Sequence, residues 1–141
     1  MTIKILGKLS AKTYQPLPFF IEAVPAGFPS PAEGYADASI DLNELCITHP
    51  SATFLVRSSG HSMINKGIFD NDLLVVDRSI EAVSGDIVVC MVNGEFTVKE
   101  LVLEQKPMLV AHNPEYQNIE LNSDMDFEVF GVVTNVIRSF K

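Results

Sequence analysis

The stretch DIVVCMVNGEFTVKELVLE, residues 86–104, describes two β-strands joined by a two-residue turn. Its two halves, 86–92 and 95–104, are rich in β-branched and aromatic side chains, which pack well on a pleated sheet. Asn93 and Gly94, which lie between them, tolerate the positive φ angles of a type I′ turn. We therefore predict an antiparallel hairpin at this point of the chain.

Segments of similar composition flank the hairpin and are separated from one another by turn-forming clusters. Six or more short strands with little helix predict a mainly β fold, namely a compact, twisted, partly closed antiparallel β-fold. A short helix is expected only within residues 39–49, with Asp41 or Ser39 as its N-cap. The strands predicted outside the hairpin lie at 52–59, 72–79, 107–112 and 127–137.

Prolines mark the boundary of this β-rich region. Five of the eight prolines lie between residues 16 and 31. Because proline lacks an amide donor and has a fixed φ, this stretch cannot continue a helix or lie inside a sheet. We predict two parts: an N-terminal arm at residues 1–38, largely extended and flexible, and a β-rich domain at residues 39–141.

Composition limits the possible functions. The chain has 141 residues and a net charge of −8, and this acidic balance argues against autonomous DNA binding, which normally uses a basic surface. No apolar run is long enough to span a bilayer. Cys46 and Cys90 form no disulfide framework or metal pattern, and no nucleotide or metal motif occurs. We expect a cytoplasmic protein with no metal, no other cofactor and no membrane attachment.

The arm contains a candidate cleavage site. Small residues at positions 24 and 26 precede Gly27, as they do before a secretory cleavage site. The apolar middle that a signal peptide needs is broken by two prolines and by Glu22. Secretion is therefore not predicted, but the Ala26–Gly27 bond is one that a protease accepting small residues could cut.

Ser62 is the first candidate for chemistry. It follows a predicted strand and a turn at Gly60, and Ser62, Met63 and Ile64 could begin a helical turn. A serine at such a point projects its hydroxyl from the turn, and nearby backbone N–H groups can face a developing oxyanion. On turn chemistry alone, however, Ser62 fits a helix cap better than a nucleophile.

Lys99 is the second candidate. Alternation along its strand places it on one face with Thr97 and Leu101. Periodicity alone favours a lysine that lays its stem on apolar surface and keeps its ammonium in water. If Lys99 is instead buried, desolvation lowers its pKa, and the neutral amine can take the proton of a serine hydroxyl.

The histidines offer weaker partners for Ser62. His61 is adjacent in the chain, and neighbouring side chains in an extended segment point apart. His49 and His112 lie in predicted loops without an evident aspartate partner. A Ser-His-Asp site therefore has no sequence pattern behind it.

The chain also resembles a known family. Several segments, in order and with the family's spacing, are similar to the UmuD-like SOS mutagenesis proteins (the UmuD, MucA and RumA type), whose peptidase domain is shared with LexA-type repressors. The resemblance covers nearly the whole chain from about residue 24. The segments are FPSPAEGY (28–35), IDLNEL (40–45), HPSATFLVRSSGHSM (49–63), DNDLLVVDRSI (70–80), GDIVVCMVNGEFTVKEL (85–101) and FGVVTNVI (130–137).

The resemblance implies a LexA- or signal-peptidase-like fold with a Ser-Lys pair. The family's serine in G-x-S-M and its strand lysine match Ser62 and Lys99, and its Ala-Gly or Cys-Gly self-cleavage bond matches Ala26–Gly27. It further implies cleavage stimulated by a RecA filament on single-stranded DNA. The shortened homodimer then serves as accessory subunit of an error-prone Y-family translesion DNA polymerase.

The expected mechanism is therefore autoproteolysis. Lys99 acts as general base and acid, Ser62 attacks the Ala26 carbonyl, and backbone N–H groups at His61 and Ser62 hold the oxyanion. One alternative is a regulatory polymerase-binding subunit whose cleavage is incidental. Another is a signal-peptidase-like protease acting on other proteins. A third, a repressor that binds an operator directly, is disfavoured because only about 40 proline-interrupted residues precede the β-rich domain.

Overall fold

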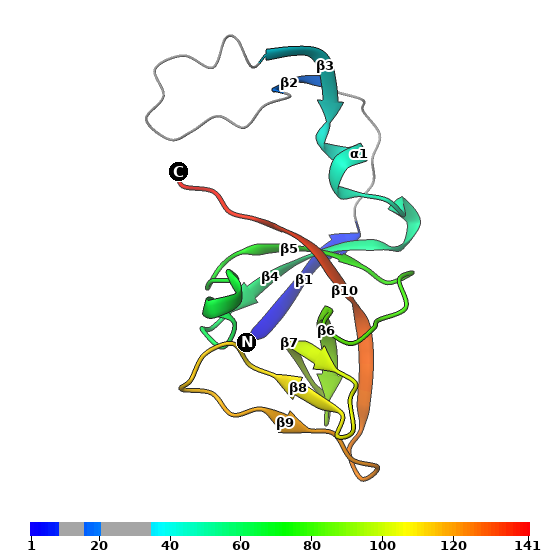
Figure 1. Ribbon diagram of the computed structural model, residues 1–141, viewed down its shortest axis with the longest axis vertical. Helices are drawn as coiled ribbons and strands as arrows, with labels where there is room; N and C mark the ends of the chain where they lie inside the picture. Colours follow the sequence, from blue (N-terminus) through cyan, green and yellow to red (C-terminus); the bar gives the residue numbers. More distant parts are fainter. Residues whose placement is uncertain (9–15, 21–34) are drawn as a thin grey trace. The chain divides into compact units, whose positions relative to one another are not determined.

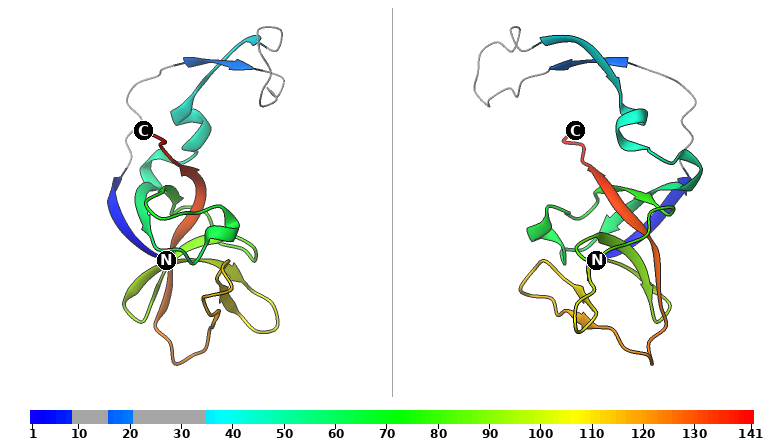
Figure 2. Two further views of the ribbon diagram at one scale, coloured as in Figure 1. Left: turned by 90° about the vertical axis from the view of Figure 1, so that its left-hand side faces the viewer. Right: turned by 45° about the vertical axis from the view of Figure 1, so that its right-hand side comes forward.

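The computed structural model describes residues 1–8, 16–20 and 35–141, with the side chains of 18–20 and 35–38 left aside. The chain divides into two units (Figures 1 and 2). The larger unit contains Met1–Leu9 and His49–Lys141, and the smaller unit contains Ser10–Thr48. The two units are described separately below.

The larger unit is built on one eight-stranded antiparallel sheet with the order β1-β4-β5-β10-β6-β7-β8-β9. Two short 3₁₀ turns, η2 and η3, interrupt the connections. The mainly β, antiparallel fold predicted from the sequence is thereby confirmed. The strands and turns are β1 (Thr2–Lys8), η2 (Pro50–Ala52), β4 (Thr53–Ser59), η3 (Ile64–Lys66), β5 (Leu73–Asp77), β6 (Ile87–Val92), β7 (Glu95–Val102), β8 (Met108–Val110), β9 (Ile119–Glu120) and β10 (Phe127–Ile137).

The sheet curls so that the start of β1 approaches β7. The Val98 N–H of β7 donates a hydrogen bond of 3.1 Å to the carbonyl oxygen of Met1, which immediately precedes β1. The N-terminal end of β1 accordingly lies within the body of the larger unit in Figures 1 and 2. The curl is partial, because β9 forms the far edge of the sheet without pairing to β1.

The predicted hairpin forms as expected. β6 and β7 pair in antiparallel register, with Val92 opposite Glu95. Asn93 and Gly94 have φ angles of 49° and 85°, the left-handed values that a type I′ turn requires. This register places the side chains of Thr97 and Lys99 on one face of β7.

Residues 1–8 were predicted as part of an arm, but in the structure they belong to the main sheet. β1 pairs with β4 from Thr2 opposite Ser59 to Lys8 opposite Phe54, with an irregularity between Ile5 and Gly7. Only one residue of β1 is even half-buried. Although Ile3 and Ile5 alternate with polar residues, the strand buries little of its surface, and its pairing depends on the edge of β4.

The smaller unit contains a two-stranded antiparallel ribbon and one helix. β2 (Pro16–Phe20) pairs with β3 (Tyr35–Asp41), and α1 (Leu42–Cys46) follows. Prolines are tolerated in β2 because every strand of a two-stranded ribbon is an edge. The predicted cap is confirmed, since the Asp41 carboxylate accepts a hydrogen bond of 3.3 Å from Glu44 N.

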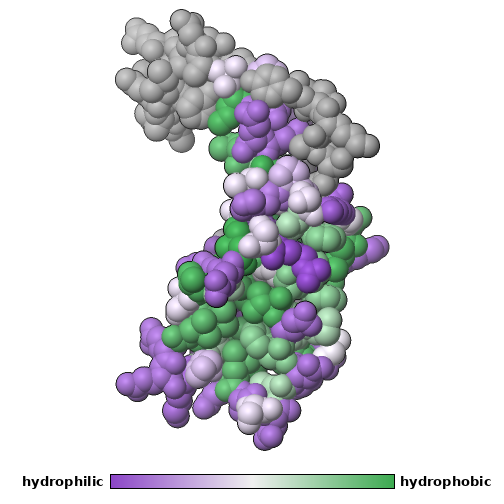
Figure 3. All heavy atoms as spheres, turned by 90° about the vertical axis from the view of Figure 1, so that its right-hand side faces the viewer, coloured by the Kyte–Doolittle hydropathy of each residue, from purple (hydrophilic) through white to green (hydrophobic). Residues whose placement is uncertain are grey.

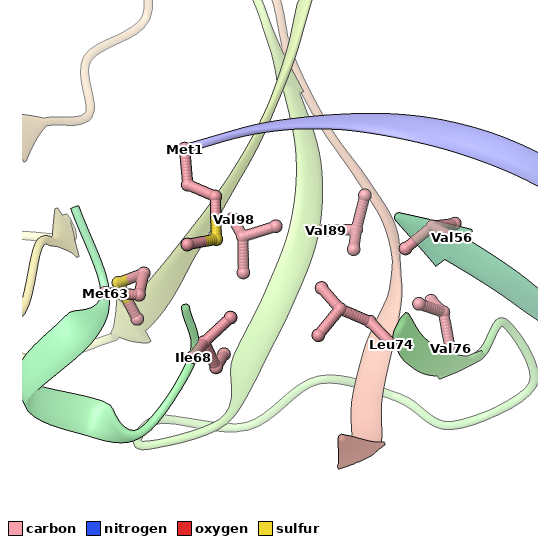
Figure 4. Close-up of a cluster of buried hydrophobic side chains, with 8 residues drawn as sticks. All are labelled: Met1, Val56, Met63, Ile68, Leu74, Val76, Val89 and Val98. Atoms are coloured by element: carbon pink, nitrogen blue, oxygen red, sulfur yellow. The ribbon is translucent and has the colours of Figure 1, made fainter. Parts of the chain in front are cut away.

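Two clusters of buried side chains form the core of the larger unit. Burying a valine, leucine or methionine contributes about 1.5–3 kcal/mol each. Figure 4 shows the first cluster, with the Met1 side chain entering it from the end of β1; its members are Met1, Val56, Met63, Ile68, Leu74, Val76, Val89 and Val98. The second contains Val88, Cys90, Leu101, Leu109 and Val132.

β5 and β10 approach closely at Gly131. A Cβ added there would lie 2.7 Å from Val76 Cγ1 and 3.0 Å from the Asp77 carbonyl oxygen. The register of β10 with β6 also shifts between Val129 and Gly131. Glycine at this position therefore permits the bend of β10.

On the face drawn in Figure 3, hydrophobic side chains gather in the middle of the larger unit and hydrophilic ones lie around them.

Candidate functional site

Ser62 lies in the turn that follows β4. Gly60, with φ of 100°, turns the chain, and its N–H donates a 2.8 Å hydrogen bond to the Asp70 carboxylate. The Ser62 carbonyl accepts a 2.8 Å bond from His112 N, so the turn is held from both sides. The Ser62 side chain is fully buried, and its hydroxyl points inward rather than to solvent. A short helical turn, η3, follows it as predicted, but its N-cap is Met63, so the expectation that Ser62 caps a helix is wrong.

Lys99 approaches Ser62 from the middle of β7. The lysine is 5% exposed, and its Nζ lies 3.2 Å from Ser62 Oγ. Nζ also donates hydrogen bonds to Thr97 Oγ1 at 2.9 Å and to the Val98 carbonyl at 3.2 Å. The prediction that the Lys99 ammonium reaches water is therefore wrong. Lys99 is buried, as activation of a serine requires.

Burial determines the protonation of Lys99. Desolvation holds its pKa below the ordinary value of a lysine. Within the described residues, no carboxylate forms an ion pair with it. A buried amine of lowered pKa beside a serine hydroxyl can accept the serine proton, which an ordinary lysine at neutral pH cannot do.

The α-amine of Met1 is a third member of the site that sequence reasoning missed. It donates a 2.7 Å hydrogen bond to Ser62 Oγ. Burial, followed by the nearby charge of Lys99, lowers the pKa of this amine from 8.0 to about 5. The charge of Lys99 thus disfavours protonation of the Met1 amine. No residue type marks this role, because every chain has an α-amine.

The backbone N–H groups of His61 and Ser62 are the predicted oxyanion donors. The His61 carbonyl accepts bonds from Ile64 N at 3.3 Å and from Asn113 Nδ2 at 2.9 Å, which fix the peptide plane. Within the described ranges, the N–H groups of His61 and Ser62 have no acceptor. The His61 side chain is exposed and does not contact the serine hydroxyl.

The other histidines contact carboxylates away from the serine hydroxyl. His49 Nδ1 lies 2.6 Å from Asp77 Oδ2, so the expectation that His49 lacks an aspartate partner is wrong. The two residues are 28 positions apart, and β5 brings them together. His112 Nε2 lies 3.3 Å from a Glu100 carboxylate oxygen. Neither pair supplies a base to Ser62.

Both cysteines are free thiols. Burial raises the pKa of the Cys90 thiol to about 11, so this cysteine is an inert buried side chain. Cys46 is half-buried. Of the residues that the structure describes, none form a cluster of three or more His, Cys, Asp or Glu side chains that could hold a metal ion.

The predicted cleavage bond, Ala26–Gly27, lies outside the described residues. The structure therefore brings together Ser62, Lys99 and the backbone at His61, and does not position the bond that they are predicted to cut. No helix among the described residues has the length and apolar character needed to cross a membrane.

Comparison with known proteins gives consistent matches over most of the chain. The family model described as Peptidase S24-like matches residues 18–134. The chain is 42% identical to Protein MucA of Salmonella typhimurium over 96% of its own length and 93% of that protein. It is 47% identical to Protein ImpA of Escherichia coli over 86% and 83% of the two chains.

A repressor is also among the relatives. The LexA repressor of Pseudomonas chlororaphis is 42% identical over 84% of this chain and 59% of that protein. The matches to the family model, to the mutagenesis-type proteins and to the repressor cover the same β-rich region that contains Ser62 and Lys99. The chain therefore belongs to the Peptidase S24-like family, as a UmuD-like member of it.

Proposed function

We propose that this protein is a self-cleaving SOS mutagenesis protein, a serine peptidase that cuts its own Ala26–Gly27 bond with Ser62 and Lys99. The observation that carries the proposal is the burial of Lys99 with its Nζ 3.2 Å from Ser62 Oγ, in a chain of the Peptidase S24-like family. The family assignment gives the reaction class, and the geometry supports the roles of the two residues.

The first chemical step is attack by Ser62. Neutral Lys99 takes the hydroxyl proton, and Ser62 Oγ forms a bond to the Ala26 carbonyl carbon. The carbonyl oxygen becomes an oxyanion held by the His61 and Ser62 N–H groups, which have no other acceptor within the described residues. Loss of one such donor typically raises the barrier by about 3–4 kcal/mol.

The second step breaks the peptide bond, and hydrolysis then releases the arm. The Lys99 ammonium gives its proton to the Gly27 nitrogen as the Ala26–Gly27 bond breaks, which leaves Ala26 esterified to Ser62. Water, deprotonated by Lys99, then hydrolyses the ester and regenerates the serine. The products are fragments 1–26 and 27–141. Small residues at the cut let the peptide backbone approach a buried hydroxyl.

The biological role follows from the relatives. We infer that a RecA filament on single-stranded DNA stimulates this cleavage, and that the shortened homodimer acts as accessory subunit of a Y-family polymerase. The high identity to MucA and ImpA over more than four-fifths of their lengths supports this inference. An activator raises the rate only as far as it favours the arrangement with the arm docked.

The test is fragment mass. The purified full-length chain is incubated with RecA, single-stranded DNA and a non-hydrolysable ATP analogue, or alone at a pH near the ordinary lysine pKa of about 10.4. Wild type should break after Ala26, and Ser62→Ala and Lys99→Met should remain intact. Ser59→Ala and Lys106→Met, which alter exposed residues, are the matched controls and should cleave normally. Cleavage that persists in Ser62→Ala would overturn the proposed function.

A further inference from the structure

The first residue of the chain occupies the chemical centre of the site. The Met1 amine is 2.7 Å from Ser62 Oγ, closer than Lys99 Nζ at 3.2 Å. Its carbonyl accepts hydrogen bonds from Val98 N at 3.1 Å and from Thr97 Oγ1 at 2.9 Å. Its side chain is 8% exposed and packs in the core cluster of Figure 4.

These contacts exclude a substrate. A nucleophile must approach the scissile carbonyl to about 3–3.5 Å. In this structure a nitrogen occupies that distance from Ser62 Oγ, and the hydroxyl is fully buried beneath it. The Val98 N–H, which could bind the backbone of an extended peptide, is already bonded to Met1. A bound scissile peptide and a docked Met1 cannot coexist.

The position of Met1 resembles that of a cleavage product. Lys99 must deliver a proton to the amine that leaves when the acyl-enzyme forms, so that amine must lie beside both Lys99 and Ser62 Oγ. The Met1 α-amine lies there, with the following residues extended along β4. The N-terminal strand therefore occupies the site as the leaving fragment of a substrate would.

We propose that β1 is a built-in inhibitory strand: Met1 docks on Ser62 as a product mimic, and self-cleavage begins only when β1 withdraws from the site. This inference rests on the proposed function, because it names the contact that restrains the same serine. The inhibitory strand also explains in structural terms how an activator could act. An activator speeds cleavage by favouring the undocked strand, and it does so only to the extent that it binds that form better.

β1 is suited to reversible docking. It pairs through hydrogen bonds with β4 alone, and its pairing is irregular between Ile5 and Gly7. Of its own residues only Ile3 is half-buried, packed against the core cluster that holds Met1, and the other six are exposed. Docking therefore depends on Met1 and Ile3, and changes there alter the docked population without touching Ser62 or Lys99.

A reversible lock tests the proposal directly. Thr2 and Ser59 are exposed register partners on β1 and β4, a spacing that a disulfide can bridge. Thr2→Cys/Ser59→Cys is made in a Cys46→Ala chain, with Met1 retained as checked by intact mass. The oxidised chain should cleave at least about tenfold more slowly than the same chain after reduction. Val92→Cys/Glu95→Cys, a register pair beside the distant hairpin turn, is the matched control and should show no such difference.

A second variant opens the strand. Ile3→Ser removes the half-buried contact, and we expect about tenfold faster cleavage in the absence of the RecA filament. Ile5→Ser, at an exposed position of the same strand, should leave the rate unchanged. An oxidised lock that cleaves as fast as its reduced form would overturn the inhibitory strand. If wild type fails to cleave under every condition, the proposed function itself is wrong, so the two failures are distinguishable.

Discussion

Thr97 Oγ1 connects the Lys99 amine to the Met1 carbonyl: it accepts a 2.9 Å hydrogen bond from Lys99 Nζ and donates one of 2.9 Å to that carbonyl. Since Thr97 and Lys99 are two positions apart in β7, the strand itself aligns the hydroxyl with the lysine. Thr97 is thus a positioning residue for Lys99 and part of the docking site for Met1.

Replacement of Thr97 by valine should therefore change the pH profile as well as the rate. Without the hydroxyl the ammonium loses an acceptor, so the Lys99 pKa should fall further and the midpoint of the cleavage profile should move to lower pH. The maximal rate of self-cleavage in the presence of the RecA filament should fall about tenfold, because the lysine is less well oriented. Thr97→Ser should restore both quantities. A profile that keeps its midpoint would show that Thr97 has only a packing role.

The pH dependence of cleavage follows from the lowered pKa of Lys99. The base must be neutral, so the rate should rise with pH through the pKa of Lys99 and level off above it, at a pH below the ordinary lysine value of about 10.4. Lys99→Arg should abolish cleavage at every pH because arginine does not deprotonate. Lys106→Arg is the control at an exposed position. A rate that falls as pH rises from neutral would contradict Lys99 as the base.

The Met1 amine should make stability depend on pH between about 5 and 8. Its pKa is about 5 in the folded chain and 8.0 ordinarily, so in this interval the unfolded state binds more protons than the folded state. The free energy of unfolding therefore rises with pH over this range through this group. The charged or titrating neighbours of the amine are Lys99 and Cys90.

Urea unfolding at several pH values measures this effect. N-terminal acetylation removes the titrating amine, so the acetylated chain should lose that part of the slope, while histidines contribute equally to both chains and cancel. Equal slopes in the two chains would mean that the Met1 amine is not docked in solution.

Asp72, a buried carboxylate that pairs with an arginine near the C-terminus, should contribute to stability at acid pH. Asp72 is 1% exposed, and Arg138 Nε donates to its Oδ1 at 2.7 Å. The arginine bond lowers the pKa of Asp72, so the stabilisation is present above the ordinary pKa of aspartate and is lost as pH falls through the lowered one. Arg138→Gln should destabilise the fold near neutral pH, because it leaves the buried carboxylate short of a partner. Arg57→Gln, at a half-buried arginine that bonds only Asn71, should have a smaller effect; equal losses in urea unfolding would contradict the pair's importance.

Gly131→Ala should destabilise the sheet by about 1–3 kcal/mol, because the new methyl group would lie within 2.7 Å of Val76 Cγ1. A double-mutant cycle with Val76→Ala gives the check. The two changes should be non-additive in thermal or urea unfolding, since removal of the Val76 methyl groups makes room for the new Cβ. Strict additivity would mean that the close approach is relieved elsewhere.

The hairpin and the face of Lys99 could be predicted from sequence because both are local properties. A two-residue turn fixes the register of its strands, and alternation then fixes which side chains share a face. The proximity of Ser62 to Lys99 was different in kind. Turn chemistry and periodicity favoured a cap and an exposed lysine, and only the family resemblance pointed to a pair.

The parts that sequence reasoning missed are contacts between distant segments with weak local patterning. Six of the seven residues of β1 are exposed and one is half-buried, so burial distinguishes this strand only weakly from an extended arm. The His49–Asp77 pair and the two-residue strand β9 likewise depend on how the sheet is assembled. The Met1 amine is the limiting case, because its role comes from position alone.

The hydrogen bond between Thr97 Oγ1 and the Met1 carbonyl spans 96 positions of the chain. During synthesis on the ribosome, the residue made first must wait for its binding partners until most of the protein has been translated. Lys99 is made only two residues after Thr97, so a nascent chain cannot assemble the serine with its base before the groups that hold Met1 also exist. Under the proposed mechanism, the order of synthesis therefore supplies the binding partners of Met1 no later than the base of Ser62.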